Sequence, residues 1–453
     1  MYQKSRSHFA AKLWALPAIV AAVCIVILAF NPGCLNEDAI DQYEQAVVRH
    51  YVDWHPATMS ILWSYLLRLY DGIQSMLSFS VIAFSVGLAM IVQAARQTWV
   101  KALIFFGVIA VPPVFAFLGM VVKDTVMGTL LVLGIGAYYS YRAKRNWISL
   151  SIALIAMYLA CAVRQNGIIM VSPILCLLFW EYLIPRGKKY AILLVPLMTL
   201  VTMLGFFGLL KLTIFVYDVA PGHPEQGVML YDLAALSTRS GRLLAPAEFI
   251  LPGTTVNEIR AELDPFNAGD LFWGGQRIYT FQNSSTAMKD LRSTWLRAIW
   301  DRPIAYLRWR TTVFETFAGL EDQILQPFIE SCIVPNSAGL KVADTQVHRA
   351  VTAYLMFFAN SLLFRLFFYL LLLLATVGYG IWRRRADLIV IGASAFLYAT
   401  AYFFLICQST FRFASPSVLV AIVLVARILS EGVISPDHER STVHDPSHKV
   451  ASR

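Results

Sequence analysis

Long apolar runs, separated by short polar connections, dominate this chain. A membrane-spanning helix needs about 20 mostly apolar residues, and the runs approach that length. They cover 13–30, 75–95, 102–121, 125–141, 147–163, 168–184, 190–216, 360–382, 387–407 and 416–430. The pattern predicts an all-α polytopic membrane protein with about ten transmembrane helices.

Basic residues gather in every second connection between these runs. Because Lys and Arg concentrate in cytoplasmic loops, we expect those connections and both termini to be cytoplasmic. The first run is followed by Asn31-Pro32-Gly33 rather than by a small-residue cleavage site, which favours an uncleaved anchor. The basic residues are Lys4, Arg6, Lys12, Arg96, Lys101, Arg142, Lys144, Arg145, Arg186, Lys188, Lys189, Arg383, Arg384 and Arg385.

Two of the predicted external regions are long. Residues 217–359 mix charges, Gly/Pro-rich turns and the helical patterns 286–300 and 303–317, which predicts a partly helical periplasmic domain. The expected organisation is an N-terminal transmembrane module 1–216 with the first external loop 31–74, the external region 217–359, a C-terminal transmembrane module 360–435 and a polar cytoplasmic tail 436–453.

Composition agrees with this picture and excludes other classes. Hydrophobic residues make up 58% of the chain and charged residues 14%, against about 25% charged in a soluble domain. Six cysteines in 453 residues are too few for a disulfide scaffold. The net charge of +9 is spread over the connections rather than over one phosphate-binding face, so we expect no nucleic-acid partner.

The few charges on the predicted external side are candidates for function, because charges near a membrane are costly. Carboxylates combined with guanidinium groups suit a reaction between a hydroxyl nucleophile and a phosphate leaving group. In the first loop, the spacing of Asp38, Asp41 and Gln45 places them on one helix face, a spacing that a solvated amphipathic helix shares. The candidates are Asp38, Asp41, Glu44, Arg49, Lys123, Asp124, Arg164 and Arg412.

Four short elements follow one another in an order that resembles the GT-C class of membrane glycosyltransferases. They are the first-loop Asp38 followed by Asp53-Trp54-His55-Pro56 and an apolar interfacial stretch from Ile61 to Leu69, then Lys123-Asp124, Arg164-Gln165-Asn166-Gly167, and Arg412-Phe413-Ala414-Ser415-Pro416. Each element is short, and together they cover about half of the chain. Phe413 stands where the class more commonly has Tyr.

The resemblance implies transfer of a sugar from a polyprenyl-phosphate-linked donor to a cell-envelope glycan or glycolipid acceptor, with inversion, in a bacterial inner membrane. Asp38 would be the base, and Asp41 a second catalytic carboxylate. Substrate-binding residues would be Arg164, Arg412, Asp124, His55, Lys123 and Asn166. Asp38 and Asp124 could instead hold a divalent cation, and all-oxygen ligands suit Mg²⁺, Mn²⁺ or Ca²⁺.

Two other functions remain open at this point. A polysaccharide polymerase or ligase would use similar arginines without needing an acid directly after the first span. A lipid or glycan transporter predicts broken helices and polar residues near the bilayer midplane. Pro112-Pro113 is a feature of the first kind, but no mid-span carboxylate accompanies it. Cys34 and Cys332 both fall on the predicted external side, either as a disulfide or as two free thiols.

Overall fold

The computed structural model describes residues 14–273, 275, 277–320, 332–336 and 339–432. Over these residues the chain forms α-helices and short 3-10 turns, and its few β-bridges are isolated. The basic residues Lys4, Arg6 and Lys12, Gly274 and the predicted tail 436–453 lie outside the described residues.

Each apolar run predicted from the sequence is helical in the structure. The helices are α2 (Ala15–Phe30), α5 (Gln74–Ile91), α6 (Thr98–Ala110), α7 (Pro112–Gly119), α8 (Lys123–Lys144), α9 (Trp147–Val163), α10 (Ile168–Leu183), α11 (Lys188–Val216), α18 (Leu366–Trp382), α19 (Ala386–Leu405) and α20 (Ser415–Gly432). Among the described residues, five helices are long and apolar enough to cross a membrane, or up to six if a bent pair counts as one span.

The run 102–121, expected as one continuous helix, is instead two helices. α6 ends at Ala110, α7 begins at Pro112, and their axes are bent by 72°. Proline has no backbone N–H and clashes with the preceding turn, so it is accepted at the first position of a new helix rather than inside one.

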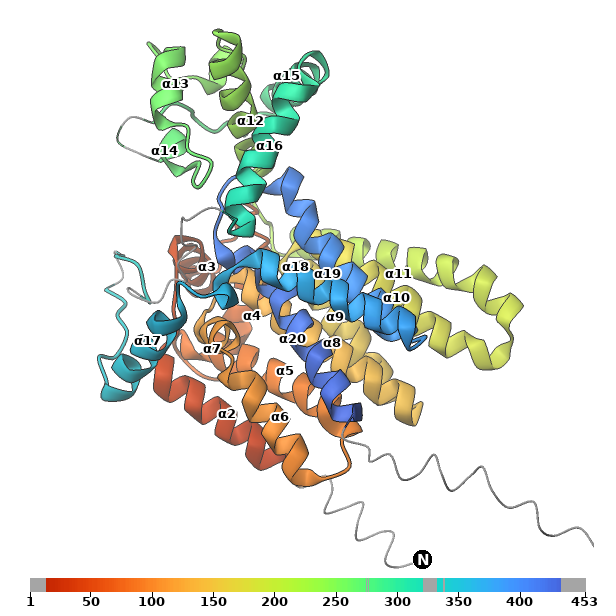
Figure 1. Cartoon of the computed structure of the whole chain (residues 1–453). Helices are drawn as coiled ribbons and strands as arrows, with labels where there is room; N and C mark the ends of the chain where they lie inside the picture. The colour runs from red at the N-terminus through yellow and green to blue at the C-terminus, as the bar shows by residue number, and fades with distance from the viewer. Residues whose placement is uncertain (1–13, 274, 276, 321–331, 337–338, 433–453) are drawn as a thin grey trace, which may run out of the picture.

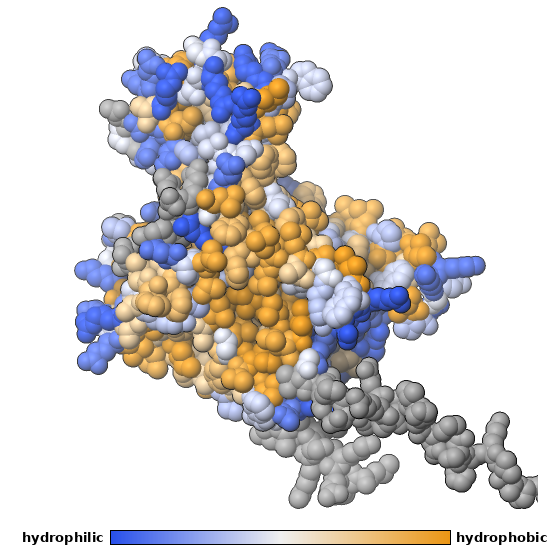
Figure 2. Space-filling model, viewed as in Figure 1, coloured by the Kyte–Doolittle hydropathy of each residue, from blue (hydrophilic) through white to orange (hydrophobic). Residues whose placement is uncertain are grey.

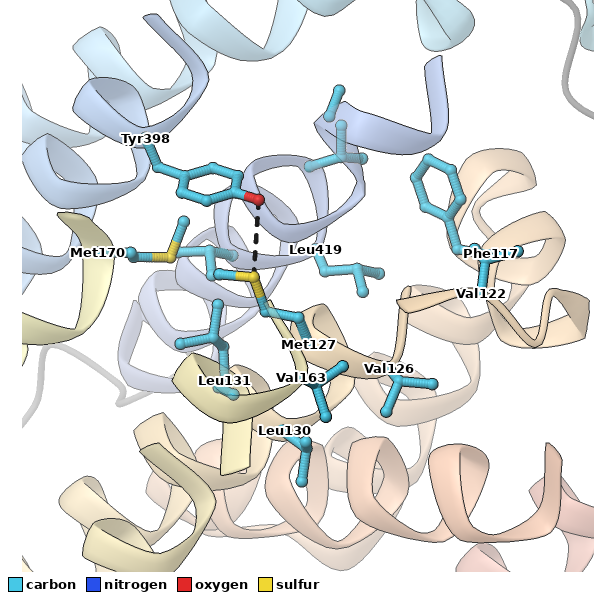
Figure 3. Packing of buried hydrophobic residues seen from close by; sticks show 14 of the residues in the cluster. Phe117, Val122, Val126, Met127, Leu130, Leu131, Val163, Met170, Tyr398 and Leu419 are labelled. Atoms are coloured by element: carbon cyan, nitrogen blue, oxygen red, sulfur yellow. Dashed lines mark hydrogen bonds between the residues drawn. The ribbon is translucent and has the colours of Figure 1, made fainter. Parts of the chain in front are cut away.

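α8 is the central helix of the apolar body and is buried along most of its length. It packs against α5, α9 and α20. A Cβ at Gly136 would collide with the backbone of Gly87 on α5, so this pair of glycines allows the two helices to approach closely. Figure 3 shows the packing around Met127, where the hydroxyl of Tyr398 lies 3.6 Å from the methionine sulfur.

A second, more polar lobe stands on one end of the apolar body (Figures 1 and 2). It consists of α12 (Glu225–Ser240), α13 (Val256–Glu262), α14 (Gly269–Phe272), α15 (Ser285–Asp301) and α16 (Pro303–Ala318). The predicted helices 286–300 and 303–317 are confirmed as α15 and α16. α17 (Gln346–Phe358) is separate from the lobe and packs against α2 and α7.

The first loop folds as two helices, α3 (Glu37–Val48) and α4 (Ala57–Leu66). The side chain of Asn36 caps α3 by accepting a hydrogen bond from the N–H of Ala39 at 3.2 Å. α4 begins four residues before the predicted interfacial stretch. It packs against α3 and buries Met59 and Trp63 completely, so much of this helix contacts protein.

Cys34 and Cys332 form a disulfide in the structure. Backbone hydrogen bonds also join the segments next to the disulfide. The N–H of Leu35 donates to the carbonyl of Cys332 at 2.7 Å, and the N–H of Val121 donates to the carbonyl of Cys34 at 2.9 Å. The start of α3 is therefore joined to the residues just before α8 and to the segment that leads towards α17.

Candidate functional site

Four distant segments bring charged side chains together around Asp38. Asp38 lies in the first turn of α3, His55 precedes α4, Lys123 opens α8 and Arg412 lies in a 3-10 turn before α20. One carboxylate oxygen of Asp38 lies 3.0 Å from Nη2 of Arg412 and 3.2 Å from Nζ of Lys123. The other lies 3.5 Å from Nε2 of His55. The structure thus brings together four of the residues predicted from the sequence.

Local structure explains why the carboxylate sits here. The N-terminus of a helix favours negative charge, and Asp38 occupies the first turn of α3. The backbone pairing of Cys34 with Val121 holds that turn beside the start of α8. Nζ of Lys123 therefore lies within reach of both Asp38 and Nδ1 of His55, at 2.6 Å from the latter.

Burial and the neighbouring charges determine whether Asp38 and His55 are charged or neutral. Burial would raise the pKa of Asp38, but the positive charges of Lys123 and Arg412 outweigh it and hold that pKa well below its usual value. Burial and the neighbouring Lys123 lower the pKa of His55 to about 3. At neutral pH, Asp38 is therefore an anion and His55 a neutral imidazole.

Asp41 lies one helical turn beyond Asp38 and forms no ion pair with another residue that the structure describes. Its carboxylate accepts a hydrogen bond from the side chain of Gln45 at 2.7 Å. Partial desolvation raises the pKa of Asp41, whereas that of Asp38 is lowered. The two first-loop carboxylates therefore differ in basicity despite their shared helix face.

Asp124 and Arg164 form a second, more deeply buried pair. Nε of Arg164 lies 2.8 Å from Asp124, whose side chain is fully buried. The guanidinium of Arg164 donates to the hydroxyl of Tyr402 at 3.1 Å, and the amide of Asn166 donates to the same hydroxyl at 2.9 Å. Tyr402 was not predicted, because a tyrosine inside an apolar run gives no sign of polar partners.

Phe413 connects the two clusters. The guanidinium carbon of Arg164 lies 5.0 Å from the centre of its ring, and that of Arg412 lies 4.9 Å from it. The ring also stacks on Tyr402, with centroids 5.7 Å apart. An aromatic ring attracts guanidinium groups through its faces and needs no hydroxyl for this contact.

A cavity of about 680 Å³ opens beside the Asp38 cluster. Asp38, Asp41 and Arg412 line one part of it, and Trp54, Phe272 and Trp273 form an aromatic part. Phe272 and Trp273 come from the lobe, so both bodies of the protein contribute to the cavity. Nη1 of Arg412 is buried and has no hydrogen-bond partner among the described residues.

A second cavity of about 340 Å³ lies between α9, α11 and the start of α12. Much of its wall is apolar, and Asp53, Lys211 and His223 add polar groups. Gln165, which also lines it, is the chain neighbour of Arg164, and Asp53 precedes Trp54 of the larger cavity. Neighbouring residues of the chain, Asp53 and Trp54, thus line the two cavities.

The predicted cation ligands do not fit a divalent metal. Asp38 is surrounded by Arg412, Lys123 and His55, and Asp124 is paired with Arg164. Over the described part of the chain, there is no group of three or more His, Cys, Asp or Glu side chains that could hold a metal ion. We therefore assign no chemical step to a cation.

A buried ion pair in the lobe has no counterpart in the sequence predictions. Nη2 of Arg310 lies 2.6 Å from Asp232, and both side chains are completely buried. Nη1 of Arg310 donates to the carbonyl of Ile406 at 2.6 Å, at the end of α19 and close to the cavity residues Cys407 and Gln408. The only sequence feature that could have predicted this ion pair is the position of Asp232 within an otherwise apolar helical stretch.

The opposite ends of the apolar helices carry another ionic network. Arg142 on α8 lies 3.1 Å from Asp387 on α19, and Arg385 lies 2.6 Å from the same carboxylate. Arg427 pairs with Glu431 within α20 at 2.6 Å. Ionic groups thus gather at both ends of these helices, and the Asp38 cluster belongs to the end that carries the lobe.

The chain matches no protein-family model, no curated protein and no solved structure.

Proposed function

We propose that this protein transfers a sugar from a polyprenyl-phosphate-linked donor to a hydroxyl of a cell-envelope glycan or glycolipid acceptor. The observation that carries the proposal is the Asp38 carboxylate, held by Arg412, Lys123 and His55 beside a large cavity. One carboxylate for the nucleophile and several cations for a phosphate meet the needs of this reaction.

The cations would bind the donor phosphate. Arg412 lines the cavity, and its Nη1 has no hydrogen-bond partner in the described part of the chain. Lys123 contacts the same carboxylate oxygen of Asp38 as Arg412 does. Charge-assisted bonds from these groups to the phosphate would strengthen as the sugar–oxygen bond breaks. Arg164, expected as a second phosphate ligand, is engaged by Asp124 and Tyr402, so we assign it the task of positioning Arg412 through Phe413.

In the chemical step, an acceptor oxygen forms a bond to the anomeric carbon. The bond between that carbon and the phosphate oxygen breaks, and its electron pair leaves with the phosphate. Asp38 takes the proton of the attacking hydroxyl, and a single displacement of this kind inverts the anomeric centre. A phosphate anion bound to Arg412 and Lys123 would offset their charges, which raises the pKa of Asp38 from its depressed value and restores its basicity.

The two cavities suit the two parts of such a donor. The larger one combines carboxylates with the aromatic rings of Trp54, Phe272 and Trp273, and the C–H faces of sugar rings pack on such rings. The smaller one offers Met203, Phe206 and Leu210 to an apolar chain. Asp41, with its raised pKa, would contact sugar hydroxyls.

The location of the charges favours this function over transport. Asp38, Lys123, Arg164 and Arg412 all lie at helix ends, whereas a carrier is expected to hold ionisable groups near the bilayer midplane. We place the protein in a bacterial inner membrane, with the lobe and the Asp38 cluster on the periplasmic side. A polymerase or ligase acting on lipid-linked glycans remains the alternative.

Binding of undecaprenyl phosphate, the leaving group shared by donors that carry different sugars, tests the proposal without knowledge of the sugar. Native mass spectrometry of the purified protein should show this lipid bound, and undecaprenol, which lacks the phosphate, should bind much less. Arg412→Gln should lower occupancy, whereas the exposed Arg96→Gln should leave it unchanged. Equal binding of both lipids, or equal binding by both variants, would contradict the proposal.

A further inference from the structure

The corner between α15 and α16 exposes a set of large apolar side chains on the lobe. Trp300 is 86% exposed and Ile304 is 67% exposed, and Leu296 and Leu307 are also exposed. Residues three or four positions apart share one helix face. Leu296 and Trp300 therefore lie on one face of α15, and Ile304 and Leu307 lie on one face of α16. Exposed apolar groups gathered in this way generally mark a contact surface.

The other end of α16 is fixed to the apolar body. α16 packs against α18 and α19, and Arg310 donates to the carbonyl of Ile406 at the end of α19. The N–H of Ser409 donates to the carbonyl of Phe266 at 2.7 Å. The lobe is therefore held at the ends of the apolar helices by side-chain and backbone bonds.

α16 runs at an angle to the long helices of the apolar body. In Figure 1, α16 runs across the direction of α8 and α9 rather than continuing it, and α13 and α14 lie on the other side of the lobe. The corner is at the end of α16 far from α19. In Figure 1 this end of α16 lies at the top of the lobe.

The residues around the corner have the composition of a membrane-interface segment. Arg297, Arg302 and Arg308 alternate with the apolar side chains between 296 and 308, and Asp301 is the one acidic residue of that stretch. Trp at the headgroup level, aliphatic side chains below it and arginines beside anionic phosphates are typical of helices that lie in the interface.

We propose that the α15–α16 corner docks into the headgroup region of the lipid bilayer, with Trp300 and Ile304 inserted and the arginines on anionic phospholipids. The inference rests on the proposed membrane insertion and not on sugar transfer. Docking would hold the lobe, and with it Phe272 and Trp273, at a fixed height above the membrane. The cavity would then face a lipid-linked substrate at constant depth.

Spin labels on the full-length protein in nanodiscs of phosphatidylcholine and phosphatidylglycerol test the docking. Single cysteines at Trp300→Cys or Ile304→Cys, in a background without the free cysteines Cys24, Cys161, Cys176 and Cys407, should collide more with oxygen than with a water-soluble nickel chelate. Ala261→Cys, exposed on α13, is the aqueous control, and Leu204→Cys on α11 is the lipid control.

The outcomes separate this inference from membrane insertion itself. Labels at 300 and 304 that behave as at 261, while the label at 204 reports lipid, overturn the docking alone. An aqueous signal at 204 overturns both. Because the label replaces Trp300, brominated lipids provide a second measurement on the native side chain. They should quench the fluorescence of the wild-type protein more than that of Trp300→Phe, and equal quenching would contradict the docking.

Discussion

Arg412 contacts Asp38 across 374 residues of sequence, with Nη2 3.0 Å from the carboxylate. The contact joins the turn before the last apolar helix to the first loop after α2. It also places Arg412 where it lines the cavity while its charge is partly neutralised. A phosphate that enters the cavity competes with Asp38 for this guanidinium, which couples donor binding to release of the proposed base.

Replacement of Asp38 by asparagine should abolish sugar transfer while the protein still inserts and folds. The amide keeps the size of the side chain but cannot accept the proton, and general-base catalysis contributes about 10²–10⁴-fold. The rate of transfer from a polyprenyl-linked donor in proteoliposomes measures this. Asp41→Asn, the matched control on the same helix, should lose less. A wild-type rate in Asp38→Asn would show that the base is another group.

Replacement of Arg412 by alanine should weaken donor binding by about 10- to 100-fold, because a hydrogen bond to a charged group contributes about 1.5–3 kcal/mol. Arg412→Lys should recover part of the affinity, since the charge returns without the two-pronged geometry. Titration with undecaprenyl phosphate provides the measurement. Unchanged affinity in Arg412→Ala would remove this residue from the phosphate site.

Replacement of Arg164 by methionine should mainly reduce stability, because it leaves Asp124 buried without a counter-ion. Loss of one partner of a buried pair costs about 3–5 kcal/mol. The double variant Arg164→Met/Asp124→Asn removes the stranded charge and should recover much of the loss. Thermal unfolding in detergent compares the three proteins. A double variant no more stable than Arg164→Met would contradict a stability contribution from this ion pair.

Acid should destabilise the protein through His55. The pKa of His55 falls from 6.5 to about 3 in the folded protein, so below pH 6.5 the unfolded chain binds a proton that the folded one does not. The contribution of neutral His55 to the free energy of unfolding is therefore complete above pH 6.5. It decreases as pH falls towards 3, by up to about 1.4 kcal/mol per pH unit.

His55→Gln should remove this dependence. Asp38, whose pKa is lowered, loses its own contribution only below about pH 4. Asp41, whose pKa is raised, titrates in both proteins, so the difference between them from about pH 4.5 to 6.5 reports the histidine. The difference in midpoint temperature between wild type and His55→Gln should shrink across that interval as pH falls. A constant difference would show that His55 takes up its proton equally in both states.

The Cys34–Cys332 disulfide should protect both thiols from labelling. In membranes without reductant, a maleimide reagent should not modify either residue, even after the protein is denatured, whereas reduction followed by denaturation should make both thiols reactive. Loss of a native disulfide typically costs about 2–5 kcal/mol, so Cys34→Ser should unfold at a lower temperature. Ready labelling of Cys34 in the unreduced protein would contradict the bridge.

The sequence predicted the helices well because apolar runs and turn residues are local signals. α15 and α16 were predicted almost to the residue, but the third run was predicted as one helix although Pro112 lies at its break. Arg365, a charge inside the predicted run 360–382, coincides with the later start of α18 at Leu366. Ten spans are more than length and composition alone support in the structure, since several of these helices are short.

The site was predicted as a set of residues, but not as pairs. Motif order indicated that Asp38, Lys123, Asp124, Arg164 and Arg412 would share one end of the helices, yet nothing in it divides them into an Asp38 cluster and an Asp124–Arg164 pair. That division depends on side-chain reach in three dimensions.

Polar contacts made by residues within regular apolar or helical stretches were also not predicted. Tyr402 lies in an apolar run, and Asp232 and Arg310 lie 78 residues apart in helices whose spacing gives no sign of a charge pair.

A cryo-EM map of the protein with undecaprenyl phosphate bound tests the central claim most directly. We expect phosphate density within hydrogen-bonding distance of Arg412 and Lys123, beside Asp38, with the prenyl chain running into the apolar cavity between α9 and α11. Phosphate density at the opposite ends of the helices, near Arg142 and Arg385, would contradict it.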